Sequence, residues 1–121
     1  DPRGMGVPIL KYGDVLVATL QEDPSDADLI DFERDLTEKV GTMRARAVII
    51  DVTALTVLDS FATRTLREVA YAVRLRGAHA VVVGIQPEVA FAMVQLGLAL
   101  DGTETALDLE QGLLLLSRSE Q

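Results

Sequence analysis

The chain has no cysteine, no tryptophan and a single histidine among its 121 residues. The lack of cysteine excludes disulfide bonds, thiolate nucleophiles and cysteine-ligated zinc. Basic residues are also scarce: 19 acids against 11 bases give a formal net charge of −8, which disfavours nucleic acid or anionic lipid as a partner. No apolar run approaches the roughly 18–20 residues of a membrane span, and no signal segment opens the sequence, so we expect a cytoplasmic protein that does not bind membranes.

The composition is that of one folded domain. Apolar residues make up 49% and charged residues 25%, a balance typical of globular proteins rather than disordered chains. We expect a single domain over residues 7–118. Residues 1–6 are expected to be a disordered or appended N-terminus, because the start Asp1-Pro2-Arg3-Gly4 lacks an initiator methionine.

The first third of the chain predicts a hairpin and a helix. Apolar runs at 7–12 and 15–20 flank Gly13-Asp14, which has the length and composition of a primed β-turn. Ser25 can cap the helix that follows, with Asp28 three residues on as its partner. Gly41 is expected to end this helix, and its buried stripe recurs at spacings of three and four: Leu29, Phe32, Leu36, Val40 and Met43.

The rest of the chain alternates strands and helices. Residues 47–50 and 80–83 are unbroken apolar runs, typical of parallel strands covered by helices on both faces. A helix is predicted between them over residues 59–76, another begins at Pro87, and a short extended segment precedes a last helix from Asp108. We therefore expect an α/β fold of order ββαβαβα(β)α, with four helices and a mostly parallel central sheet carrying an N-terminal antiparallel hairpin strand.

Function is expected where parallel strands end, in the loops of residues 51–60 and 84–87. His79 enters its strand at the opposite end of the sheet from Ser60, which disfavours a Ser–His–Asp arrangement. Neither glycine-rich phosphate loop occurs, and carboxylates along one helix make no closed metal cage. Asp51 ends a buried strand as in a receiver domain, but the acidic pair and the lysine of that site are missing. We expect no catalytic residue, metal or cofactor.

Asp59-Ser60 opens the second predicted helix, and either residue can be its N-cap. A hydroxyl at a helix N-terminus on this edge of the sheet is well placed to carry a phosphate. Residues 50–60 (IDVTALTVLDS) resemble the signature of STAS domains, the anti-sigma-factor-antagonist family, and residues 84–87 are similar to that family's second loop. Residues 7–10, 84–90 and 104–113 most resemble the minimal, single-domain scaffold subunit of the stressosome.

The resemblance covers residues 7 to about 116 and implies a STAS fold with a non-enzymatic role as scaffold and phosphoswitch. It implies Ser60 as the phosphoacceptor, with Asp51 and Asp59 beside it and a partner-binding environment formed also by Phe61, Gly84 and Gln86. Phe61 departs from many members, which have a small residue there. The implied partners are a GHKL-type serine/threonine kinase released on phosphorylation, a longer STAS paralogue with a sensory N-terminal domain, a phosphatase, and further copies in a homo- or hetero-oligomer.

Three questions stay open. The chain could instead be a freestanding anti-anti-sigma factor that is phosphorylated at the same serine and binds an anti-sigma factor directly. The acidic stretch 22–38 (eight acids, one arginine) and the basic stretch 44–76 (six arginines, three acids) are either solvated faces or complementary docking surfaces. Phe61, Tyr71 and Leu75 lie outside the inward stripe of their helix, so they are either partly buried against a neighbour or part of a self-association face.

Overall fold

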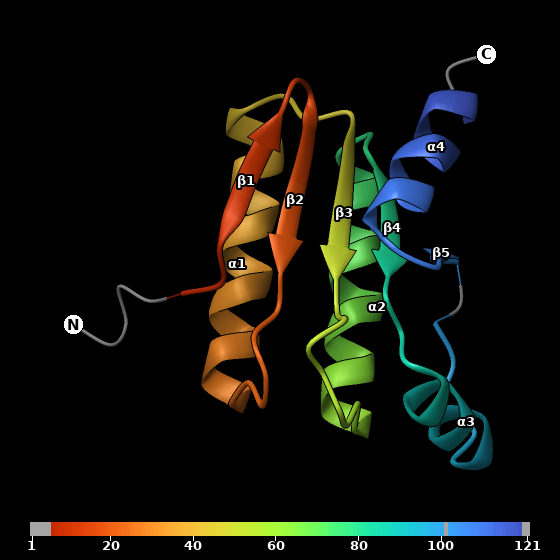
Figure 1. Ribbon diagram of the computed structural model, residues 1–121. Coiled ribbons are helices and arrows are strands. Elements are labelled where there is room, and N and C mark those ends of the chain that lie inside the picture. The colour runs from red at the N-terminus through yellow and green to blue at the C-terminus, as the bar shows by residue number, and fades with distance from the viewer. Residues whose placement is uncertain (1–5, 101, 120–121) are drawn as a thin grey trace.

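Five strands form one sheet in the computed structural model, which describes residues 6–100 and 102–119 (Figure 1). The strands lie side by side in chain order: β1 (Ile9–Tyr12), β2 (Val15–Thr19), β3 (Ala47–Asp51), β4 (His79–Val83) and β5 (Glu104–Ala106). β1 and β2 pair antiparallel and every later neighbour is parallel. Gly13 between β1 and β2 has a φ of 61°, which the first central residue of a type II′ turn requires. The expected hairpin and mixed sheet are confirmed.

Four helices surround this sheet: α1 (Asp26–Thr42), α2 (Ser60–Leu75), α3 (Pro87–Gln95) and α4 (Leu109–Ser119). α1 and α2 lie side by side on one face, α4 packs on the other face against β3, β4 and β5, and α3 lies beyond the carboxyl end of β4 (Figure 1). The element order ββαβαβαβα is the predicted one, with the short extended segment present as β5. None of the described helices is both long and apolar enough to cross a membrane.

The sheet separates two apolar cores. The larger core lies between the sheet and α1 and α2, and the smaller one lies under α4. Successive residues of β3 point alternately into these cores, Ile50 into the first and Ile49 into the second, and both are fully buried. Burial on both faces explains why the β3 and β4 sequences are unbroken apolar runs rather than alternating ones.

The end of α1 differs from the prediction. Gly41 lies inside the helix, which continues to Thr42, and the C-cap is Met43. The chain turns away at Arg44, whose φ of 51° ends the helical repeat. Met43 is therefore 40% exposed instead of buried with the rest of the stripe. Of the expected N-terminal appendage, residues 1–5 lie outside the described residues, and Gly6 precedes the domain as exposed coil.

Candidate functional site at the carboxyl edge of the sheet

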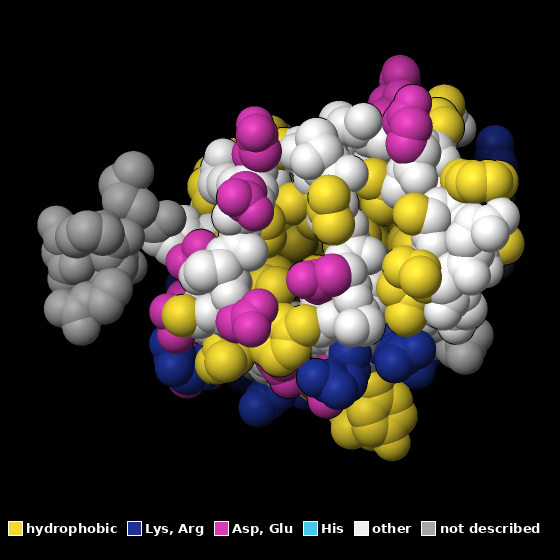
Figure 2. Space-filling view, turned by 90° about the horizontal axis from the view of Figure 1, so that it is seen from below, with side chains coloured by type: hydrophobic (Ala, Val, Ile, Leu, Met, Phe, Trp, Pro, Cys, Tyr) yellow, Lys and Arg dark blue, Asp and Glu magenta, His cyan; other side chains and the backbone are white. Residues whose placement is uncertain are grey.

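The carboxyl ends of β2, β3 and β4 lie at one edge of the sheet, where the chain turns into α1, α2 and α3 (Figure 1). Figure 2 views this edge end-on. Acidic side chains are scattered over this face, most of them in its left half, around a hollow with an apolar floor, and Lys and Arg side chains gather along the lower rim. A cavity of about 90 Å³ opens here, lined by Asp23, Pro24, Asp26, Leu29, Thr56, Val57, Asp59 and Ala62.

The start of α2 leaves one hydroxyl unused. Asp59 has an extended backbone, and its Oδ1 accepts a hydrogen bond from the Ala62 N–H at 2.8 Å. Asp59 is therefore the N-cap, which decides between the two residues that the sequence allowed. Ser60 is the first helical residue, and its side chain is exposed. Among the described residues, no side chain or backbone group hydrogen-bonds its hydroxyl, so this oxygen is available to another molecule.

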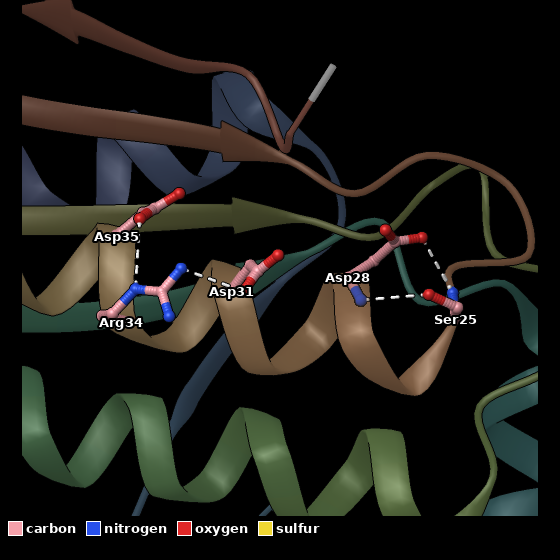
Figure 3. A network of polar contacts seen from close by, with 5 residues as sticks. All are labelled: Ser25, Asp28, Asp31, Arg34 and Asp35. Atoms are coloured by element: carbon pink, nitrogen blue, oxygen red, sulfur yellow. Dashed lines mark hydrogen bonds and ion pairs between the residues drawn. The ribbon is translucent and has the colours of Figure 1, made fainter. Parts of the chain in front are cut away.

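At the start of α1, by contrast, the serine oxygen is engaged in a hydrogen bond, and we call this a closed helix start. The Ser25 Oγ accepts from the Asp28 N–H at 3.0 Å, while the Asp28 carboxylate accepts from the Ser25 N–H at 2.9 Å (Figure 3). This reciprocal capping box confirms the predicted start of α1. One turn further on, Arg34 pairs with Asp31 at 2.9 Å and lies 3.8 Å from Asp35 (Figure 3).

Thr53 holds the loop between β3 and α2 in place. The Asp51 Oδ1 accepts from the Thr53 N–H at 2.9 Å and from its hydroxyl at 2.6 Å, and Gln86 donates its side-chain N–H to the Thr53 carbonyl at 2.6 Å. Gly84 has a φ of 83°, and a Cβ there would overlap the Thr53 hydroxyl and lie 3.1 Å from the Thr53 nitrogen. Asp51, Gly84 and Gln86 thus meet at Thr53, where they support the loop.

These three predicted site residues form no hydrogen bond with Ser60 in the described part of the chain. They contact the loop that leads to Ser60, and the side chains of Leu55 and Leu58 further along this loop are buried. Sequence reasoning named Asp51, Gly84 and Gln86 but did not identify Thr53 as their common partner. The Asp-x-Thr spacing was the available signal, because a short Asp side chain often accepts from the backbone two residues on.

Phe61 and Arg64 form the outer side of the first turn of α2. Phe61 is half-buried and packs against the larger core. The guanidinium carbon of Arg64 lies 5.6 Å from the centroid of the Phe61 ring, within reach of a cation–π interaction. Sequence reasoning did not single out Arg64, although a spacing of three residues on a helix predicts such a contact. Tyr71 and Leu75 are 57% and 70% exposed, so of the three apolar positions in question only Phe61 is partly buried.

The middles of α1 and α2 bring two carboxyl groups together. Burial, reinforced by the nearby Glu68 carboxylate, raises the pKa of Glu33 above its ordinary value. This pair lies away from the carboxyl edge of the sheet. Among the described residues no group of three or more side chains is arranged to hold a metal ion. His79 is the first residue of β4, at the predicted end of the strand, and its side chain is exposed.

A family model described as the STAS domain matches residues 7–111. The RsbT co-antagonist protein RsbRA of Bacillus subtilis (strain 168) is 34% identical over 79 residues, which are 65% of this chain and 29% of that protein. The chain therefore spans less than a third of the length of that relative.

Solved structures share the fold over nearly the whole chain. An RsbS variant from Moorella thermoacetica is 36% identical, with a TM-score of 0.82, and the match covers 94% of this chain and 97% of that one. A chain of the structure "Molecular architecture of the stressosome, a signal integration and transduction hub" is also 36% identical, with a TM-score of 0.78 and coverage of 94% and 99%. The anti-sigma factor antagonist SpoIIAA in its unphosphorylated form shares the fold at 10% identity, with a TM-score of 0.69 and coverage of 93% and 98%.

Proposed function

Since the chain belongs to the STAS domain family, we propose that it is a non-enzymatic scaffold and phosphoswitch of a cytoplasmic signalling complex of the stressosome type. The observation that carries the proposal is the Ser60 hydroxyl at the first residue of α2, which is exposed and forms no hydrogen bond with any described residue. The likeness to RsbS and to the stressosome chain, at 36% identity over 94% of this chain, supports the scaffold role.

In this proposal a GHKL-type serine/threonine kinase binds the unmodified protein and phosphorylates Ser60. The γ-phosphoryl group of ATP passes to the Ser60 Oγ, the hydroxyl proton is lost, and ADP leaves. A phosphoserine adds a charge of about −1.5 to −2 at the surface that the kinase contacts, and the kinase is released. A phosphatase hydrolyses the ester and restores the hydroxyl.

Phosphorylation acts on the surface rather than on the fold, because no described hydrogen bond has to break. The N-cap bond uses the Asp59 carboxylate and the loop bonds use Thr53, so both survive when the Ser60 oxygen is esterified. The backbone N–H groups at the start of α2 also favour a negative group there by roughly 0.3–1 kcal/mol. That contribution partly offsets the repulsion from the Asp59 carboxylate.

Assembly with a longer STAS paralogue completes the proposal. The RsbRA match covers only 29% of that protein, which therefore carries a further segment beyond the part that resembles this chain. Exposed apolar side chains outside the two cores, Tyr71 and Leu75 on α2 among them, support contacts with other subunits. In a homo- or hetero-oligomer of this kind the chain contributes a STAS unit and its phosphoacceptor.

The test combines labelling with association. Incubation with ATP and a candidate kinase, followed by mass spectrometry, is expected to place one phosphate on Ser60 and none on the Ser60→Ala variant. Ser25→Ala is the matched control and should be labelled like the parent, because Ser25 belongs to the closed start of α1. A phosphate that persists in Ser60→Ala, or a kinase that never associates with the unlabelled protein, would overturn the proposal. Association with an anti-sigma factor, without a paralogue, would favour the freestanding factor instead.

A further inference from the structure

The arginines of α2 are used in different ways. Arg67 donates to the Ala99 carbonyl at 3.1 Å, and Arg74 donates to the Gly102 carbonyl, so both tie the segment before β5 to the helix. Arg64 is exposed and, within the described residues, makes neither a hydrogen bond nor an ion pair. Its guanidinium lies over the Phe61 ring. Arg64 is thus the α2 arginine nearest to Ser60 along the helix and has donors to spare.

The side chain of Arg64 already reaches the turn that contains Ser60. Residues four apart on a helix lie on the same face, and their side chains lean toward the helix N-terminus. Phe61 is the chain neighbour of Ser60, and the Arg64 guanidinium lies over its ring at 5.6 Å. A group attached to the Ser60 oxygen would therefore be within reach of the guanidinium after a change of side-chain torsion alone.

We propose that Arg64 binds the phosphoryl group of phosphoserine 60 and leaves the Phe61 ring to do so. The proposal rests on the function above in taking Ser60 as the phosphorylated residue. A guanidinium presents paired N–H donors that match phosphate oxygens, and such charge-assisted bonds are stronger than a cation–π contact at an exposed site. The phosphate would also lie one residue from the Asp59 carboxylate, a like charge, so a neighbouring cation would stabilise it further.

The exchange of partners by Arg64 would alter the surface next to Ser60 in two ways. A free cation stacked on an aromatic ring becomes a cation paired with a dianion, and the outer face of Phe61 loses its cover. A kinase that docks on the unmodified surface would lose both features when Ser60 is esterified. Through Arg64, phosphorylation would thus change the surface around Ser60 and not only the serine side chain itself.

The test measures the phosphate directly. Phosphoserine is introduced at position 60 during translation, and the second pKa of the phosphate, ordinarily about 6, is followed by ³¹P NMR. Arg64→Gln is expected to raise this pKa by about half a unit, because a nearby cation favours the dianion. Arg76→Gln is the matched control: it removes the same charge 16 residues beyond Ser60, about 24 Å along the helix axis, where salt screens it. It should leave the pKa unchanged.

A second readout follows the aromatic ring. Nuclear Overhauser contacts between the Arg64 side chain and the Phe61 ring are expected in the unmodified protein and should be lost in the phosphorylated one. Equal phosphate pKa values in the parent and Arg64→Gln, or contacts that persist after phosphorylation, would overturn the proposal. Because phosphoserine is inserted without a kinase, this outcome is distinct from a failure of any kinase to label Ser60.

Discussion

The starts of α1 and α2 use serine and aspartate in opposite order, and the order decides whether a hydroxyl is free. In Ser25-Asp26 the serine is the N-cap, and its oxygen accepts from the Asp28 N–H. In Asp59-Ser60 the aspartate is the N-cap, and the serine is the first helical residue, with a hydroxyl that no described group hydrogen-bonds. Two helices on the same face of the sheet thus begin with the same two residue types, yet only at the second is the serine hydroxyl without a hydrogen bond among the described residues.

The loops that lead into these helices differ as well. The loop before α1 ends in the reciprocal bonds of Ser25 and Asp28, which are local to four residues. The loop before α2 depends on a neighbour, because Gln86 from the end of β4 bonds Thr53 and Gly84 makes room for it. The loop that leads to Ser60 is therefore supported by residues of a neighbouring loop, whereas the capping hydrogen bonds at the start of α1 are local.

Exchanging the aspartate and the serine at the start of α2 is expected to have the largest effect of the variants considered, a loss of phosphorylation. The double variant Asp59→Ser with Ser60→Asp gives α2 the order found at α1, so the new serine becomes the cap and its hydroxyl is engaged. Labelling by the kinase should be lost, while the free energy of unfolding changes by less than about 0.5 kcal/mol, since serine and aspartate cap equally well. Mass spectrometry and urea unfolding measure the two effects. A phosphate at position 59 of the double variant would break the comparison.

Adding a side chain at Gly84 tests how far the loop of residues 84–87 supports the loop before α2. Gly84→Ala is expected to cost about 2–4 kcal/mol of unfolding free energy, because it adds left-handed backbone strain to an overlap with Thr53. Gly13→Ala is the matched control, with a φ of 61° and no heavy atom within 4 Å of the added Cβ. It should cost only the backbone strain, about 1–2 kcal/mol. Equal losses in urea unfolding would show that Thr53 moves aside freely.

The two caps are expected to differ modestly in strength. Asp59→Ala should cost about 1 kcal/mol, and Ser25→Ala somewhat more, up to about 2 kcal/mol, because the reciprocal bond from Asp28 loses its geometry as well. Thermal unfolding measures both, at about 4 °C for each kcal/mol in a domain of this size. Asp59→Asn keeps a capping oxygen and should remain close to the parent. A larger loss of unfolding free energy in Asp59→Ala than in Ser25→Ala would contradict the view that the reciprocal bonds make the start of α1 the stronger cap.

The smallest effect is expected where α1 and α2 meet at Glu33 and Glu68. Because burial and the Glu68 carboxylate raise the pKa of Glu33, the folded state binds this proton more tightly than the unfolded chain does. Stability therefore rises as the pH falls through the raised pKa toward the ordinary value of 4.5. Glu33→Gln should add about 0.3 kcal/mol at pH 7, with the gain vanishing once the parent is protonated. Glu38→Gln, exposed on the same helix, is the control, and a gain at pH 7 equal to that of Glu33→Gln would contradict the assignment.

Local signals predicted much of this fold correctly. The capping box of Ser25 and Asp28 spans three residues, so the sequence contains everything it needs. The unbroken runs of β3 and β4 likewise indicated two-sided burial, which the two cores confirm. The end of α1 was predicted wrongly, because glycine is compatible with a helix end but does not impose one, and the left-handed turn came at Arg44 instead.

The candidate site could be predicted only in outline. Both Asp59 and Ser60 are good N-caps, so spacing alone left the cap undecided, and with it the state of the hydroxyl. Gln86 and Thr53 are 33 residues apart, and the local sequence of neither segment predicts the hydrogen bond between them. The contact between Arg64 and Phe61 could be predicted from their spacing of three residues on a helix. The lack of a hydrogen bond or ion pair for Arg64 among the described residues could not be predicted in this way.

The sequence by itself determined the order of strands and helices, the capped start of α1, and a serine beside an aspartate at the edge where function gathers. These follow from periodicity and from hydrogen bonds that reach only a few residues. The tertiary structure alone decided which of the two residues caps α2, what supports the loop before it, and which arginine of α2 has no hydrogen-bonding partner among the described residues. Such outcomes depend on how segments that are distant in the chain pack together. A local sequence pattern does not specify which distant residues come into contact.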